Sequence, residues 1–342
     1  MHYIPKILQN AISISIITIR ISAYFEVFWV YTLSEYVTNA GNIMTNTPVV
    51  FSLSDHYQFR NRLCEQLQYE LGQITIHQFP DKETLIKIDN DLKDKPVIFI
   101  VSLDNPNEKI LTLLFAVETA RSLGAKRIGL VAPYLAYMRQ DKQFQSGEGI
   151  SSIYFAKLLS TYFDWMMTID PHLHRWHSLS DVFSIDTTLL HSTQPIAQWI
   201  KKHVERPLLI GPDIESTQWV AEIAKMSQSP FLIVEKTRMG DAHVISTIPK
   251  IELYPDHTPL LIDDIISTGV TMVETVMHIQ SYGIDSIICL AVHAIFANHA
   301  YELLLKTGVT KVVTCNTIAH PTNEIDLSDL VTDAVKLMTH TV

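Results

Sequence analysis

The chain has few cysteines, and they are widely separated. Its 342 residues include only three, Cys64, Cys289 and Cys315. An odd number at such distances excludes a disulfide scaffold and a CxxC zinc site, and it is typical of a protein in the reducing cytoplasm. We therefore expect a cytoplasmic protein.

Basic residues are also few, and they are outnumbered by acidic ones. Lys and Arg number 26 against 36 Asp and Glu, which gives a formal net charge of −10. Such a chain has no general positive field for nucleic acid, so any anionic ligand must be held by a local pocket. Charged residues make up 18% and hydrophobic ones 47%, a composition of compact globular proteins that excludes disorder. The length suits roughly two domains.

One long apolar stretch covers residues 7–33 and is interrupted by Arg20 and Glu26. It is long enough to span a bilayer, but a central charge costs ~2.5–3.5 kcal/mol on insertion scales. Met44 lies just before an apolar run that begins at Pro48 and has the character of a first strand. We expect residues 1–47 to be an extension outside the fold, as an over-long gene model would produce. A membrane anchor and a targeting segment remain the alternatives.

From residue 48 onward, short β-rich runs alternate with amphipathic helical patterns. Near-continuous Val, Ile and Leu runs predict strands that are covered on both faces, hence an α/β fold with parallel sheets. The expected strands are 48–53, 74–78, 96–102, 126–132, 165–169, 207–211, 230–235, 258–263, 285–292 and 310–314. The expected helices are 55–71, 108–123, 150–163, 192–204, 214–227, 270–282 and 299–307. The series divides near residue 190, without a low-complexity linker.

The most informative segment follows the strand expected at 258–263. There an apolar run ends in two carboxylates, and a turn rich in Ser, Thr and Gly opens a helix. Turn N–H groups and hydroxyls can surround a phosphate, and the carboxylates suit ribose hydroxyls, directly or through a divalent ion. The alternative is a simple helix cap. We predict a sugar-phosphate site, the phosphate loop, made of Asp263, Asp264, Ser267, Thr268, Gly269, Val270 and Thr271.

The phosphate loop resembles the loop that binds phosphoribosyl pyrophosphate (PRPP) in type I phosphoribosyltransferases and in the ribose-phosphate pyrophosphokinase (PRPP synthetase) family. Further segments resemble motifs of the synthetase family in the same order, from residue 48 to about 335. They are Phe79–Glu83, Pro133–Lys142, Ile169–His172, Gly211–Asp213 and Glu235–Arg238. The resemblance implies two tandem phosphoribosyltransferase-like domains, 48–190 on the ATP side and 191–342 on the ribose 5-phosphate side. The last helix is expected to pack back on the first domain.

The resemblance implies a transfer of the diphosphoryl group from MgATP to ribose 5-phosphate. Lys236 and Arg238 are the expected catalytic cations; they are two apart on an extended segment, so they share one side of it. Arg238 also belongs to the expected ribose 5-phosphate site. His172 and Asp213 each follow a buried strand and are the expected Mg²⁺ ligands. The residues expected to bind ATP are Phe79, Asp81, Glu83, Arg139, Gln140 and Asp141.

A neighbouring subunit completes the adenine pocket in this family, so the resemblance also implies a homo-oligomer, at least a dimer. The segments 143–150 and 235–238 look closer to the archaeal-type branch. Two positions depart from the family pattern: Val270 replaces a second glycine, and Pro171 replaces a leucine. These departures make a non-catalytic, regulatory synthetase-like subunit one alternative function. A phosphoribosyltransferase acting on a base, which would explain the phosphate loop alone, is the other. Histidines other than His172 are expected to be structural.

Overall fold

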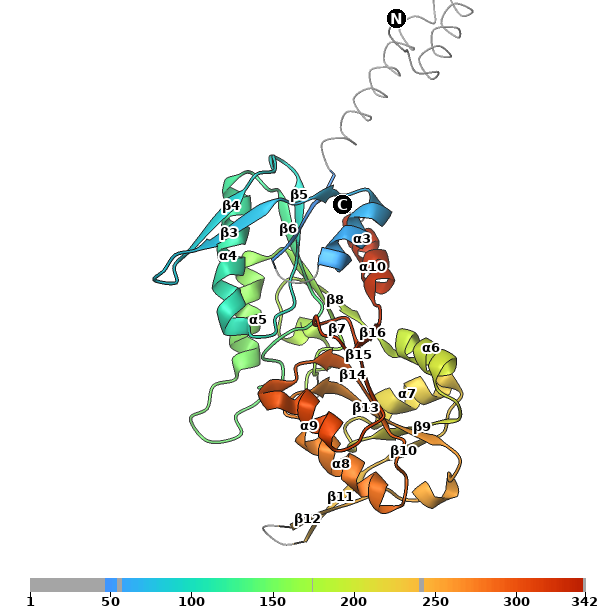
Figure 1. Ribbon diagram of the computed structural model, residues 1–342. Coiled ribbons are helices and arrows are strands. Elements are labelled where there is room, and N and C mark those ends of the chain that lie inside the picture. The colour runs from blue at the N-terminus through green and yellow to red at the C-terminus, as the bar shows by residue number, and fades with distance from the viewer. Residues whose placement is uncertain (1–46, 54–56, 174, 240–242, 341–342) are drawn as a thin grey trace, which may run out of the picture. The chain divides into compact units, whose positions relative to one another are not determined.

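Two six-stranded parallel sheets form the framework of the described residues (Figure 1). The computed structural model describes residues 47–53, 57–173, 175–239 and 243–340, without the side chains of 236–239, 243–246 and 340. The predictions for residues 7–33 therefore lie outside the described residues. Within the described ranges, no helix is long and apolar enough to cross a membrane.

The first sheet has the strand order β2-β1-β5-β6-β7-β8, and every neighbouring pair is parallel. Its strands are β1 Val49–Ser52, β2 Glu70–Leu71, β5 Pro96–Ile100, β6 Arg127–Ala132, β7 Trp165–Ile169 and β8 Asp186–Leu190. The connecting helices are α3 Tyr57–Leu67, α4 Pro106–Ser122 and α5 Ser151–Tyr162, with a short η1 at Leu179–Asp181. An antiparallel hairpin of β3 Ile74–Gln78 and β4 Thr84–Ile88 stands apart from this sheet.

The second sheet has the order β10-β9-β13-β14-β15-β16 and is also parallel throughout. Its strands are β9 Pro207–Gly211, β10 Phe231–Ile233, β13 Thr258–Ile266, β14 Ile288–Ala294, β15 Lys311–Cys315 and β16 Asn323–Ile325. Its helices are α6 Thr193–His203, α7 Thr217–Ser227, α8 Val270–Ser281, α9 Ala300–Lys306 and α10 Ser328–His340, with η2 Ile251–Leu253 and η3 Ala297–His299. A second antiparallel hairpin joins β11 Glu235–Met239 to β12 His243–Thr247.

Along each central strand, successive side chains pack into different hydrophobic cores on the two faces of the sheet. Val50 and Ile98 of the first sheet share one hydrophobic cluster with Leu260 and Leu290 of the second sheet. The intervening residues of these strands, such as Phe99, pack into separate clusters on the outer faces. Because strands buried on both faces need apolar residues at every position, the continuous Val, Ile and Leu runs were a correct signal for the α/β fold. The shared core fixes the two sheets against each other.

The C-terminal helix α10 packs against α3, as Figure 1 shows near the end marked C. Arg62 of α3 lies 2.6 Å from the carboxylate of Asp326 and 2.9 Å from that of Asp329. The hydroxyls of Tyr69 and Thr339 are 2.5 Å apart. The end of the chain is thereby attached to the layer that covers the first sheet.

Several predicted elements differ from the structure. The helix expected at 55–71 ends at Leu67 as α3, and Glu70–Leu71 form β2. Residues 74–78 form an exposed antiparallel hairpin strand, because this run alternates polar and apolar side chains and lacks a second covered face. Residues 230–235 divide between β10 and the start of β11. Strand β13 continues to Ile266 where the sequence predicted an end at 263, because β14 keeps pairing with it as far as Ala294. The two carboxylates of the phosphate loop therefore stand within a strand.

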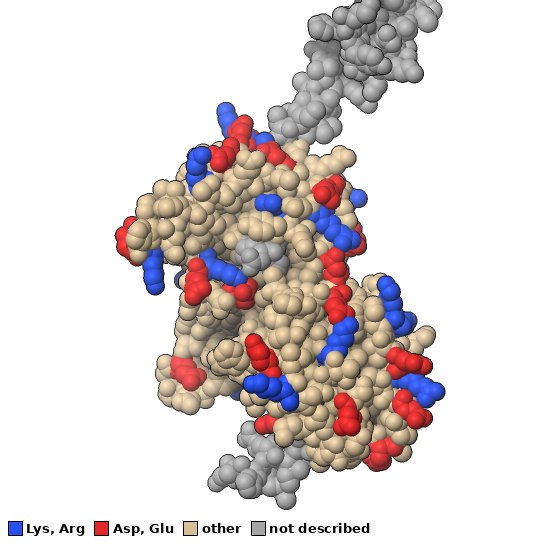
Figure 2. All heavy atoms as spheres, viewed as in Figure 1, with Lys and Arg blue, Asp and Glu red and all other residues tan. Residues whose placement is uncertain are grey.

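Charged side chains are thinly spread over the surface. On the face shown in Figure 2, basic and acidic groups are interspersed among wide uncharged areas. This distribution follows from a composition with only 18% charged residues. It leaves recognition of an anionic ligand to local features, which are found at the carboxyl ends of the strands.

Candidate active site

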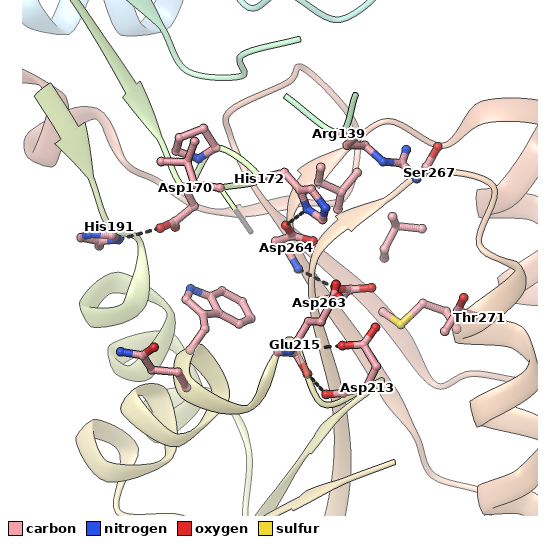
Figure 3. A pocket seen from close by; sticks show the side chains of 18 of the residues that line it. Arg139, Asp170, His172, His191, Asp213, Glu215, Asp263, Asp264, Ser267 and Thr271 are labelled. Atoms are coloured by element: carbon pink, nitrogen blue, oxygen red, sulfur yellow. Dashed lines mark hydrogen bonds and ion pairs between the residues drawn. The ribbon is translucent and has the colours of Figure 1, made fainter. Parts of the chain in front are cut away.

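A cavity of about 610 Å³ lies at the carboxyl ends of strands from both sheets. Residues that follow β7 of the first sheet and β9 of the second sheet form part of its wall, and the end of β13 with the start of α8 forms another part. Figure 3 shows the polar side chains of these segments pointing toward one another. The cavity is lined by Arg139, Asp170–Leu173, Trp176, His177, Leu189, His191, Asp213, Glu215, Ser216, Gln218, Trp219, Glu222 and Asp263–Met272.

The whole predicted phosphate loop lines this cavity. After β13 the chain makes a short turn, and α8 begins at Val270. Gly269 has a φ of 72°, and a Cβ built on it would lie 3.2 Å from the Cβ of Ala300. Only glycine adopts this conformation without strain, and its small size also allows the turn to approach Ala300. The start of α8 then presents backbone N–H groups to the cavity, as an anion site requires.

Asp264 is paired with a histidine from the other sheet. His172 Nδ1 lies 2.7 Å from Asp264 Oδ2, and the two side chains are 25% and 28% exposed. Burial acts to raise the pKa of Asp264, but the hydrogen bond and the charge of His172 outweigh it, so the pKa is lowered. Asp264 is therefore the charged member of the carboxylate pair.

Asp263 has the opposite electrostatic character. Burial, followed by the charges of Asp264 and Asp213, raises its pKa to about 8. One of its oxygens, Oδ1, accepts a hydrogen bond of 2.9 Å from the Asp264 N–H. An acidic group that resists ionisation beside a second carboxylate marks a place where a cation or a hydroxyl donor would be stabilised.

The predicted metal ligands His172 and Asp213 both line the cavity. His172 contacts Asp264, and Asp213 Oδ1 accepts a hydrogen bond of 3.1 Å from the Ser216 N–H. In the described part of the chain, no group of three or more His, Cys, Asp or Glu side chains is placed to hold a metal ion. Carboxylates that face one cavity still suit Mg²⁺, because this ion usually takes one or two protein oxygens and completes its shell with water and phosphate.

Asp170 organises the segment that carries His172. Its carboxylate lies 3.0 Å from His191 Nδ1 and accepts a 2.9 Å hydrogen bond from the Ser192 N–H, besides one from the Ser192 hydroxyl. The hydrogen bond to Asp170 raises the pKa of His191. Sequence reasoning assigned His191 a structural role, but the structure places it in the cavity wall. Its position directly after β8 was the available signal, and that strand was not predicted.

The predicted ATP-binding residues are dispersed. Arg139 projects into the cavity (Figure 3). Gln140 is exposed, and Asp141 is buried and accepts a 3.2 Å hydrogen bond from Arg175 Nε. The remaining three, Phe79, Asp81 and Glu83, occupy the exposed turn of the β3–β4 hairpin and do not line this cavity.

The predicted catalytic residues Lys236 and Arg238 lie on β11, where they pair in register with Ser246 and Val244 of β12. The strand backbone is described, but both side chains lie outside the described residues. Because they are two apart on a strand, they belong to the same face of the hairpin.

Two family models match the chain. The N-terminal domain of ribose phosphate pyrophosphokinase matches residues 48–162. The phosphoribosyl transferase domain matches residues 187–330.

Curated relatives cover most of the same region. A ribose-phosphate pyrophosphokinase of Saccharolobus solfataricus is 34% identical over 261 residues, covering 75% of this chain and 88% of the relative. One from Methanobrevibacter smithii is 29% identical over 287 residues, covering 80% and 95%. Ribose-phosphate pyrophosphokinase 1 of the bacterium Streptococcus pyogenes is 24% identical over 302 residues, covering 84% and 92%. Identity to these two archaeal proteins exceeds identity to the bacterial one.

The fold also matches a solved structure. Phosphoribosylpyrophosphate synthetase from Mycobacterium smegmatis superposes with a TM-score of 0.76 at 21% identity. The match covers 87% of this chain and 100% of that chain, so both sheets and their order along the sequence are shared.

Proposed function

Because this chain belongs to the ribose-phosphate pyrophosphokinase family, we propose that its cavity transfers the diphosphoryl group of ATP to ribose 5-phosphate. The products are PRPP and AMP. The observation that carries the proposal is the meeting, in one cavity, of the phosphate loop from the second sheet with Arg139 and His172 from the first. A phosphoribosyltransferase acting on a base would use the loop but would leave the residues from the first sheet without a role.

Ribose 5-phosphate is bound by the phosphate loop. Its phosphate accepts hydrogen bonds from the backbone N–H groups at the start of α8 and from the hydroxyls of Ser267, Thr268 and Thr271. The carboxyl groups of Asp263 and Asp264 accept hydrogen bonds from the ribose hydroxyls. This arrangement presents the C1 hydroxyl toward the part of the cavity that contains Arg139 and His172.

In the reaction, the C1 oxygen attacks the β-phosphorus of ATP, and the bond from that phosphorus to the oxygen bridging the α-phosphate breaks. AMP leaves, and the hydroxyl proton is released to solvent. Such a transfer depends on positioning and on neutralising charge more than on covalent help from the protein. Arg139 holds a phosphate of ATP, and Lys236 and Arg238 stabilise the charge that develops on the transferred group.

Mg²⁺ is the proposed cofactor, held by His172 and Asp213 beside the two loop carboxylates. When bound, it neutralises phosphate charge and orients the donor. The support is the acidic character of the cavity wall, where burial and then the neighbouring carboxylates raise the pKa of Asp263. Asp264 orients this metal site, because its carboxylate holds the ring of His172 in place.

The remaining ATP-binding residues imply self-association. Phe79, Asp81 and Glu83 lie on an exposed hairpin turn away from the cavity lining, so we propose that they complete the adenine pocket of a neighbouring copy. Gln140 and Asp141, which follow Arg139 in the sequence, are proposed to bind ATP together with it. The domains proposed are 48–190 on the ATP side and 191–342 on the ribose 5-phosphate side. Light scattering would show a dimer or larger assembly, and an active monomer would contradict this part of the proposal.

The deciding experiment supplies the full chain, and in parallel a version starting at Met44, with ribose 5-phosphate, ATP and Mg²⁺. AMP and PRPP are followed together. Equal formation of both, abolished when ribose 5-phosphate is omitted, is the expected result. Folded protein that binds ATP but forms neither product would overturn the proposal in favour of a regulatory, non-catalytic subunit. AMP without PRPP would indicate hydrolysis of ATP and would also contradict it.

A further inference from the structure

A buried histidine of the second sheet is hydrogen-bonded to the backbone of the first. His293, near the end of β14, is 1% exposed. Its Nε2 lies 3.2 Å from the carbonyl oxygen of Asp170, two residues before His172. Its ring also makes an edge contact with Tyr134, at 5.0 Å between centroids. Segments that carry the proposed ATP and metal residues therefore meet at this one side chain.

The other ring nitrogen is held by a fixed partner. His293 Nδ1 lies 2.9 Å from Thr317 Oγ1, and Thr317 is fully buried. The Thr317 hydroxyl is also 2.8 Å from the carbonyl oxygen of Val292, and the Thr317 carbonyl accepts a hydrogen bond from the Ser102 hydroxyl of the first sheet. Because both sheets hold Thr317, the imidazole has one defined orientation.

The backbone that His293 contacts is in a costly conformation. Asp170 has a φ of 36°, and it precedes Pro171. Non-glycine residues rarely take positive φ, and a following proline restricts the backbone further. Such strain persists only when the surroundings hold it. The Asp170 N–H donates to the Leu190 carbonyl at 2.9 Å, and its carboxylate is held by Ser192.

The chemistry of the partners assigns the ring protons. A carbonyl oxygen only accepts hydrogen bonds, so Nε2 of His293 carries the proton that it donates to Asp170. Burial lowers the pKa of His293 and keeps the ring neutral, even though the charges of Asp170 and Asp264 act in the other direction. Nδ1 is then an acceptor that faces the Thr317 hydroxyl, whose single proton is shared between this nitrogen and the Val292 carbonyl oxygen. Each ring nitrogen has its own hydrogen-bond partner, so a substitution can remove one of the two hydrogen bonds and keep the other.

We propose that His293 is a positioning residue that holds the strained Asp170 backbone through its Nε2–H and thereby aims His172 at Asp264. This inference rests on the proposed function, because the oriented group is a proposed metal ligand. Loss of the Nε2 contact would let the segment 170–172 relax out of its strained conformation. The phosphate loop, built on the neighbouring strand, would keep its shape.

Two amide substitutions test this assignment. A glutamine amide reaches about as far as Nε2, and an asparagine amide reaches about as far as Nδ1. His293→Gln can keep the donor to Asp170, whereas His293→Asn can keep only the contact to Thr317. We expect His293→Gln to retain kcat within about threefold, and His293→Asn to lose about 10–100-fold, as for other groups that orient a metal ligand. KM for ribose 5-phosphate should change little in either variant.

If His293 had only a structural role, His293→Gln and His293→Asn would lower kcat by similar factors. Equal losses of kcat in the two variants, or no loss in His293→Asn, would overturn the proposal. The matched control pair is His203→Gln and His203→Asn at the end of α6, where Nδ1 lies 2.8 Å from the Trp199 carbonyl oxygen and the residue does not line the cavity; both variants should keep kcat within about threefold. A difference in kcat between the two His203 variants as large as that between the two His293 variants would contradict the assignment of the effect to the Asp170 contact.

A second measurement does not depend on activity. In protein labelled with ¹⁵N-histidine, the His172 signal, assigned by its absence in His172→Gln, reports the hydrogen bond between Nδ1 and Asp264. This signal should be unchanged in His293→Gln and shifted in His293→Asn; the same shift in both would overturn the proposal. If the wild-type protein formed no PRPP, the proposed function would fail, while this measurement would still decide the role of His293.

Discussion

His172 Nδ1 and Asp264 Oδ2 lie 2.7 Å apart, although 92 positions separate the two residues in the sequence. His172 follows β7 of the first sheet, and Asp264 stands in β13 of the second. A hydrogen bond to an ionised carboxylate is stronger than one between neutral groups, and both side chains are mostly buried. This contact orients the imidazole in the wall of the cavity and joins the two halves of the proposed active site.

Asp264→Asn should lower kcat/KM for ribose 5-phosphate by about 100-fold, because it removes the charge that orients His172 and one acceptor for the ribose hydroxyls. Steady-state PRPP formation measures the effect. Asp256→Asn is the matched control, since this carboxylate is on the surface, 3.6 Å from Arg206. An Asp264→Asn enzyme with more than about a third of wild-type activity would contradict the role given to the pair.

The glycines at the two ends of α8 offer a second test. Gly269 and Gly283 have φ values of 72° and 79°, so alanine at either position costs ~1–2 kcal/mol of backbone strain. A Cβ at position 269 also comes within 3.2 Å of the Ala300 Cβ, whereas one at 283 has nothing within 4 Å. Both substitutions should lower Tm, but only Gly269→Ala should raise KM for ribose 5-phosphate, by about tenfold (~1.4 kcal/mol). A similar KM for ribose 5-phosphate in both variants would contradict a role of the phosphate loop in substrate binding.

Lys236→Ala should give a folded protein that forms PRPP about 10²–10³ times more slowly, the usual loss when one group that stabilises developing charge is removed. Lys225→Ala makes the same change of charge at an exposed position of α7 and should leave the rate unaltered. Single-turnover rates with saturating substrates provide the comparison. Near-normal turnover in Lys236→Ala would rule out its proposed role.

The two loop carboxylates should affect the pH dependence of stability with opposite signs. Burial and then the charge of Asp264 raise the pKa of Asp263 from 3.8 to about 8. Between these values the unfolded chain has lost the proton that the native state keeps, so this group makes unfolding easier as pH rises. Thermal unfolding without divalent ions should therefore show the Tm of Asp263→Asn rising relative to wild type from pH 4 to pH 8.

Asp264→Asn is the internal control for that experiment. Its carboxyl has a lowered pKa, so its contribution to stability is present above the ordinary value near 3.8 and is lost as pH falls through the native value. The variant should be less stable than wild type at pH 7, and the difference should shrink in acid. If the Tm differences of the two variants from wild type changed in the same direction as pH rose, the assignment of the charged and the neutral carboxyl would be wrong.

Local sequence patterns predicted most of the framework. The strands predicted at 96–102, 126–132 and 165–169 correspond to β5, β6 and β7, because uninterrupted apolar runs require cover on both faces. Strand β8, with the sequence Asp-Thr-Thr-Leu-Leu, was missed because it is an edge strand with polar, partly exposed residues. The hairpin strand at 74–78 was taken for a covered one, because five residues alone do not show which partner they pair with.

The sequence by itself determined the α/β class and the order of the motifs, and it predicted the residues of the phosphate loop, since each depends on neighbours within a few positions. Only the tertiary structure decided that His172 meets Asp264, that His191 lines the cavity and that His293 holds Asp170. These partners come from different strands, and strand order and register bring them together. Hydrogen bonds act over about 3 Å, so a contact between distant residues depends on the packing of the two sheets, which local patterns do not encode.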